Sequence, residues 1–129
     1  MMTERWISRA AILLLTVCAL PAFAADATGK WTCQDKDGDG NPVTLTFDFK
    51  QKGTELTGTL TIMDSNAKVL DSTRISSGKV DGDKISFATV LSDGASFTHE
   101  GTIHADEITL TVVSGGGAEI NEMTLKRSE

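Results

Sequence analysis

Few side chains in this chain of 129 residues are suited to acid-base, nucleophilic or metal chemistry. Its two histidines, His99 and His104, lie on one stretch of alternating polar and apolar residues. An odd spacing along a strand points the two imidazoles to opposite faces, so they cannot share a metal ion unless a bulge intervenes. Cys33 could face the same interior as His99, but no third group is available to orient a catalytic base. We therefore expect no enzymatic activity.

A run of carboxylates matches the start of a calcium-binding loop. Asp35, Asp37 and Asp39 alternate with other residues in the sequence DKDGDGN. A complete loop of this kind also needs a bidentate glutamate at its last position, and Thr46 stands there in this chain. We interpret the run as a polar hairpin turn, in which Asp and Gly adopt left-handed conformations. A calcium site at these three aspartates is the alternative, and no other cofactor is expected.

The elements that position these side chains are β-strands, because apolar and polar residues alternate along most of the chain. The stretch from Val43 to Lys50 is the clearest case, since its apolar and polar residues fall on opposite faces. Turn signals rich in Gly, Asp and Ser separate the alternating stretches. We predict strands at residues 30–35, 43–50, 55–63, 69–76, 84–91, 95–104, 107–113 and 119–127.

These short connections make consecutive strands antiparallel neighbours in a meander. Closing about eight such strands on themselves removes both sheet edges and leaves room for side chains or one small ligand. We therefore predict an all-β fold, an antiparallel up-and-down meander closed into a small barrel. A two-sheet β-sandwich is the alternative. The pattern leaves open whether the interior is filled or hollow.

Residues 1–24 have the features of a cleaved secretory signal peptide. Arg5 and Arg9 precede an apolar run at residues 10–20, and an A-x-A cleavage motif ends at Ala24. The run is too short for a transmembrane helix, which needs about 20 residues, and no other stretch approaches that length.

Cleavage would leave a single barrel domain, residues 25–129, in which Cys33 is the sole cysteine. No intrachain disulfide can then form, although the compartment would permit one. Lipid attachment at Cys18 is the alternative fate of the signal. The whole chain carries a formal net charge of -6, which argues against nucleic acid as a partner. We expect a periplasmic or secreted monomer without a membrane span.

Two motifs carry a resemblance to a known class of barrels. Residues 29–31 (GKW) open the first predicted strand, and residues 125–127 (LKR) lie near the end of the last. This arrangement resembles the calycins, meaning lipocalins, fatty-acid-binding proteins and avidins. In lipocalins a basic residue of the last strand packs across the Trp of a G-x-W motif. The resemblance thus implies that Gly29, Trp31 and Arg127 close the barrel.

The chain also resembles a small exported bacterial domain of unassigned function, through residues 56–59 (LTGT) and 78–83 (GKVDGD). We expect a non-enzymatic exported protein that binds a small apolar or amphipathic ligand in or at the mouth of a lipocalin-like barrel. The candidate ligand contacts are inward-facing residues: Trp31, Phe47, Phe97 and His99. The alternative is a filled barrel whose loops, residues 35–41 and 114–118, bind a protein of the cell envelope, for instance as an inhibitor.

Overall fold

The computed structural model describes residues 26–117 and 120–128, so the predicted signal peptide lies outside the described residues. Within these ranges the chain forms β-strands and no helix, and hence no helix that could cross a membrane. The strands are β1 (Gly29–Lys36), β2 (Pro42–Lys52), β3 (Glu55–Asp64), β4 (Val69–Arg74), β5 (Ser76–Asp81), β6 (Lys84–Val90), β7 (Ser96–His104), β8 (Glu107–Ser114) and β9 (Ile120–Ser128).

Alternation along each strand separates the interior of the molecule from its outer surface. In β2, Val43, Leu45, Phe47 and Phe49 are buried, while Asp48 between them is exposed. Strands β6 and β8 bury every second residue in the same way. Each strand therefore contributes one apolar face to a common core, as the sequence pattern predicts.

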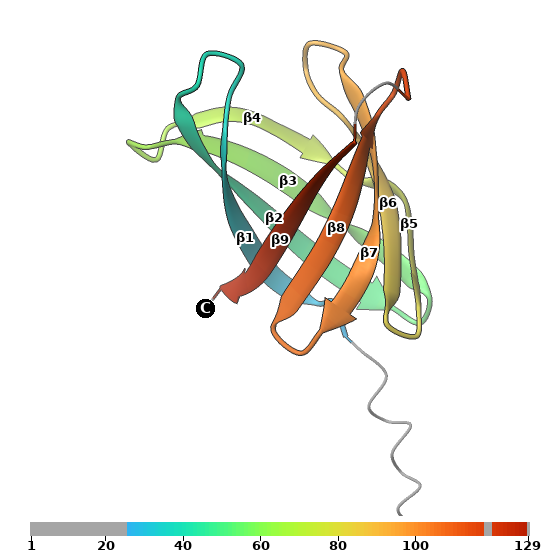
Figure 1. The fold of residues 1–129 in the computed structure, drawn as a ribbon. Helices are drawn as coiled ribbons and strands as arrows, with labels where there is room; N and C mark the ends of the chain where they lie inside the picture. The colour runs from blue at the N-terminus through green and yellow to red at the C-terminus, as the bar shows by residue number, and fades with distance from the viewer. Residues whose placement is uncertain (1–25, 118–119, 129) are drawn as a thin grey trace, which may run out of the picture.

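The strands close into a barrel. They pair antiparallel in the order β2-β1-β9-β8-β7-β6-β5-β3, and a further pairing of β2 with β3 completes the ring of eight (Figure 1). Strand β4 is an additional strand that pairs with β3 outside this ring. The prediction of a closed antiparallel barrel is confirmed, and the β-sandwich alternative is wrong.

The predicted strand at residues 69–76 is wrong in one respect, because the structure divides this region into β4 and β5. The chain bends at Ser77, whose φ is 53°, and β5 then continues to the next turn. This bend lets both strands pair with β3: β4 lies along its second half and β5 pairs with Glu55 and Leu56 at its start. Gly78 permits the change of partner because a Cβ there would collide with the backbone of Leu56.

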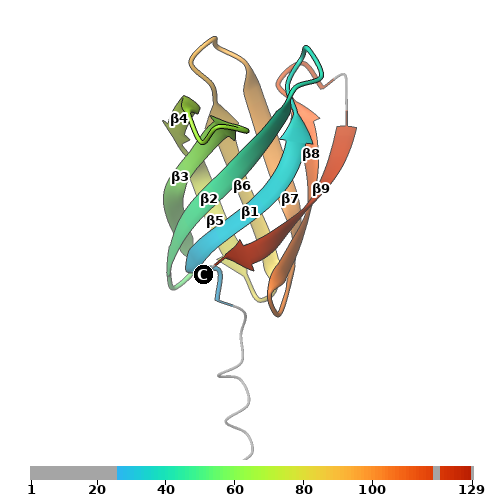
Figure 2. The ribbon, with the colours of Figure 1, turned by 90° about the vertical axis from the view of Figure 1, so that its left-hand side faces the viewer.

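Aromatic side chains fill the end of the barrel where the chain enters β1. Phe47, Phe49 and Phe87 are almost fully buried, with ring centroids 5.3 to 5.6 Å apart. Trp31 is completely buried, and its indole N–H donates a hydrogen bond to the carbonyl of Ala27 at 2.8 Å. This end, which also holds the end of β9 in Figure 2, is therefore closed by side chains.

Arg127 links the two ends of the chain at this closed end. Its guanidinium lies over the indole of Trp31, with Cζ 4.2 Å from the ring centroid. It also donates hydrogen bonds to the carbonyls of Thr28 and Asp26, at 2.9 and 3.2 Å, and to the Asp106 carboxylate at 3.1 Å. A cation on an aromatic face and charge-assisted hydrogen bonds thus act together where β1 meets β9.

Replacing Arg127 should therefore weaken the barrel more than replacing its neighbour. We expect Arg127→Ala to lower the free energy of unfolding by about 2 kcal/mol, because a cation–π contact and several hydrogen bonds are lost. Arg127→Lys should recover less than half, since an ammonium lacks the planar fork. The control is Lys126→Ala, which removes an exposed ion pair with Glu107 and should cost under about 1 kcal/mol. If urea unfolding shows that Arg127→Ala and Lys126→Ala lower the free energy of unfolding equally, Arg127 does not stabilise the closed end as described.

Gly101 offers a second test of the fold. A Cβ at this position would collide with the backbone carbonyl of Thr109 on β8, which cannot move without breaking the sheet. We expect Gly101→Ala to destabilise the protein by about 2 kcal/mol or more. A Cβ at Gly116 would meet no atom within 4 Å, so Gly116→Ala should leave the melting temperature nearly unchanged. Similar melting temperatures for both variants would mean that β7 and β8 approach less closely than described.

Candidate functional site

A cavity of about 840 Å³ opens at the end of the barrel opposite to Arg127. At this end β1 and β9 are not paired, because their pairing extends only from Lys30 to Thr32, near Arg127. Here β3 also pairs with β4 instead of β5, and β4 shares no strand pairing with β6. The two divergences widen the barrel mouth beneath the loops that join β1 to β2, β6 to β7 and β8 to β9 (Figure 1). The interior is therefore filled at one end and hollow at the other.

The wall of the cavity is mainly apolar, and its rim is polar. Inward-facing residues near the strand ends form the wall: Cys33, Val43, Leu45, Leu60, Ile62, Thr89, Leu91, Phe97, His99, Val112 and Met123. Leu70, which is 47% exposed, lies at the edge of the opening. Charged and polar residues of the strand ends and loops line the entrance: Gln34, Asp35, Lys36, Asp37, Asp71, Asp93, Asn121, Glu122 and Thr124. An apolar concave surface with a few polar groups is the usual form of a small-molecule site.

His99 is the one titratable side chain buried in this wall, among the described residues, with 3% of its surface exposed. Its ring stacks on Phe87 at a centroid distance of 4.5 Å, and Nε2 lies 3.2 Å from the Thr89 hydroxyl. Nδ1 has no hydrogen-bond partner in the described part of the chain. Burial lowers the pKa of His99 to about 4, so the imidazole is neutral near pH 7.

The four residues predicted as ligand contacts lie at different depths. Phe97 and His99 line the cavity, whereas Trp31 and Phe47 are completely buried outside its lining. Phe47 still supports the site, because its ring contacts His99 edge-on at a centroid distance of 6.0 Å. The structure thus brings Phe97, His99 and the unpredicted wall residues together, and it places Trp31 at the closed end.

The wall residues that sequence reasoning missed share a detectable signal. Leu60, Ile62, Leu91, Val112 and Met123 are apolar residues close to the loops of the open end. Alternation shows that these residues point inward, since every second residue of a strand lies on the same face. It does not show how far along the barrel axis each residue lies. Combining the inward direction with distance from the open-end loops selects most of this set.

Cys33 also lines the cavity and is half buried. Its Sγ lies 4.0 Å from the sulfur of Met123, across the gap between β1 and β9. Burial, and to a lesser extent the nearby charge of Asp35, raises the pKa of the Cys33 thiol to about 11. The thiolate, which is the nucleophilic form of cysteine, is therefore scarce at neutral pH.

The aspartate run at the first loop forms a turn. Oδ1 of Asp37 accepts hydrogen bonds from the backbone N–H groups of Asp39 and Asn41, both at 2.9 Å. These bonds hold the pKa of Asp37 below its ordinary value. No cluster of three potential metal ligands occurs among residues 26–117 and 120–128, so Asp35, Asp37 and Asp39 do not converge as the calcium alternative requires.

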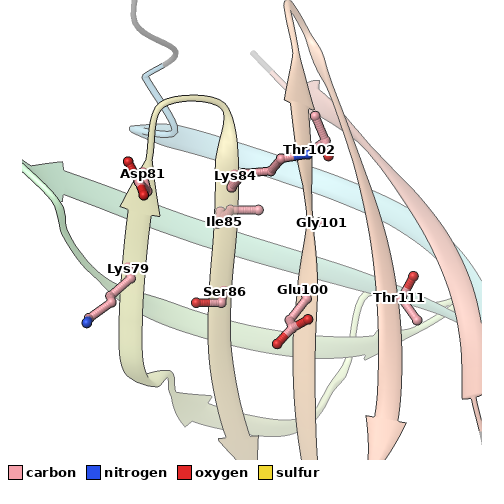
Figure 3. A pocket seen from close by; sticks show the side chains of 9 residues that line it. All are labelled: Lys79, Asp81, Lys84, Ile85, Ser86, Glu100, Gly101, Thr102 and Thr111. Carbon is pink, nitrogen blue, oxygen red and sulfur yellow. The ribbon is translucent and has the colours of Figure 1, made fainter.

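A second depression, of about 580 Å³, lies on the outer wall over β5, β6, β7 and β8. Figure 3 shows its polar side chains, which rise from neighbouring strands: Lys79, Asp81, Lys84, Ser86, Glu100, Thr102 and Thr111. It is shallow and of mixed charge, and its floor is the outside of the sheet. The cavity at the barrel mouth is therefore the candidate site.

Solved structures of designed β-barrels share this fold. One is a de novo designed fluorescence-activating β-barrel, 20% identical, which covers 81% of this chain and 96% of its own with a TM-score of 0.59. Another is a redesigned β-barrel, 14% identical, which covers 79% of this chain and 91% of its own with a TM-score of 0.59. These likenesses show the fold alone. No protein-family model and no curated protein matches the chain, so the calycin likeness stays a resemblance.

The buried imidazole gives the fold a defined pH dependence. Unfolded His99 takes up a proton near pH 6.5, whereas the folded state does so only near pH 4. The unfolded state therefore binds more protons between these values, and stability should fall by about 3 kcal/mol as pH drops across the window. His99→Leu should abolish this contribution, as measured by urea unfolding at several pH values. If the free energy of unfolding of the variant depends on pH as steeply as that of the wild type, His99 is not buried in its neutral form.

Proposed function

We propose that this protein is an exported, non-enzymatic binding protein that holds a small apolar or amphipathic molecule in the cavity at the barrel mouth. The observation that carries this proposal is the hollow end of the barrel, a cavity of about 840 Å³ with an apolar wall and a polar rim. Its wall includes the buried, neutral imidazole of His99, a polar group among apolar neighbours. A mainly apolar cavity with a few polar groups is the form that binds small molecules.

The size and lining of the cavity agree with this role. Its volume of about 840 Å³ falls within the range of about 300–1,000 Å³ that is usual for small-molecule sites. Apolar residues from six strands, including Leu45, Ile62 and Phe97, would contact the body of the ligand. We infer export from residues 1–24, whose sequence has the features of a signal peptide and would direct the protein to the periplasm or out of the cell.

Filling the cavity should abolish binding. Met123 is half buried in the wall, so Met123→Trp would occupy the mouth without entering the aromatic core. We expect the neutral fluorophore phenylnaphthylamine to bind the wild type at one site with enhanced emission, and its Kd to rise at least about tenfold in this variant. The matched control is Thr109→Trp, which adds the same side chain to the exposed outer face of β8 and should bind like the wild type.

Two results would overturn the proposal. The first is wild-type protein that gives no saturable signal, and the second is an equal Kd in both tryptophan variants, which would place the probe elsewhere. If the fluorophore does bind at the mouth, native mass spectrometry of protein purified from its own cells would identify the physiological ligand, as an organic mass that disappears on denaturation. A negative fluorophore result would direct attention to the loop-mediated alternative.

A further inference from the structure

The charges around the cavity mouth are strongly unequal in sign. Five carboxylates line it, from Asp35, Asp37, Asp71, Asp93 and Glu122, against the single ammonium of Lys36. They come from β1, β4, β9 and the loops after β1 and β6, so they surround the entrance rather than cluster on one element. An entrance lined by one sign of charge attracts ligands of the opposite sign.

Four of the five carboxylates at the mouth accept hydrogen bonds from nearby backbone or hydroxyl groups, and none of the five is buried. Both Ser92 N and Ser92 Oγ donate to Oδ2 of Asp71 at 3.0 Å, which joins β4 to the loop after β6. Asp37 is fixed by its turn. These hydrogen bonds keep both acids ionised at neutral pH without neutralising their charge.

The cavity wall itself supplies no charge of either sign. Below the rim the lining is apolar except for Thr89, Cys33 and the neutral imidazole of His99. A fatty-acid carboxylate would find no buried cation among these lining residues, and at the entrance it would meet five like charges. A positively charged group at the entrance would instead be surrounded by opposite charges while the apolar body lies inside.

We propose that the ligand is a cationic amphiphile, with its apolar body in the cavity and its positively charged group among the carboxylates at the mouth. This inference rests on the proposed function and adds the charge class of the ligand. Exposed charges interact weakly in salt, so the preference for a cation is strongest at low ionic strength.

The test compares probes with one tail and different head groups. Dodecyltrimethylammonium, dodecanol and laurate are titrated below their aggregation limits as competitors of phenylnaphthylamine. At about 20 mM salt the cation should bind at least about tenfold more tightly than laurate, with dodecanol between them. At about 500 mM salt the difference between cation and laurate should shrink to about threefold or less.

Paired variants distinguish the mouth from the overall charge of the chain. Asp35→Asn with Asp93→Asn removes two carboxylates from the entrance. Both asparagines keep an oxygen that can accept the existing hydrogen bonds from the backbone N–H groups of Lys36 and Ala95, at 2.8 and 2.9 Å. This variant should lose most of the preference for the cation. The control, Asp48→Asn with Glu100→Gln, removes two exposed charges from the outer wall and should keep it.

The outcomes separate this inference from the function on which it rests. If dodecanol and laurate bind as tightly as the cation, the charge class is wrong and the binding function stands. If the mouth variant and the outer-wall control lose the preference for the cation equally, the net charge of the chain causes that preference. The assignment of the cation to the mouth is then wrong. If no probe displaces the fluorophore from the cavity, the proposed function itself fails.

Discussion

Closure of the sheet is the constraint on which the rest of the structure depends. Every strand of the ring must pair on both sides, and two seams are short: β1 with β9, and β3 with β5. At the first seam the Trp31 indole and the Arg127 guanidinium supplement a few backbone pairs. Both seams lie toward the same end of the barrel, so that end is tight and the other is wide.

The cavity follows from this unequal closure. Large buried rings such as Phe47, Phe49 and Phe87 pack against one another and fill the tight end. Toward the open end the strands diverge, and smaller aliphatic side chains do not fill the extra space. His99 lies at the boundary, stacked on the aromatic cluster and lining the cavity. One side chain therefore joins the part of the barrel that confers stability to the part proposed to bind a ligand.

Alternation predicted the barrel and the inward face of most strands, because burial on one side of a sheet imposes a period of two. It did not predict β5, since the bend near Ser77 depends on where β3 has room for a second partner. It also grouped Phe47 with Phe97 as ligand contacts, although the former is buried outside the cavity lining. Depth along a barrel is set by strand register and tilt, which a single strand's pattern does not contain.

The seam between β1 and β9 also has a consequence for the order of folding. Adjacent hairpins form from residues close in the sequence, whereas the hydrogen bond from Arg127 to Thr28 joins residues 99 positions apart. Forming a contact of such long range costs more chain entropy than forming a hairpin. The interactions that offset this cost form only after the two ends have met. The meander can thus assemble progressively as an open sheet, and joining its two ends is the step that turns it into a barrel. The ring cannot close before β9 has been synthesised, because β9 is the last of its eight strands in the sequence.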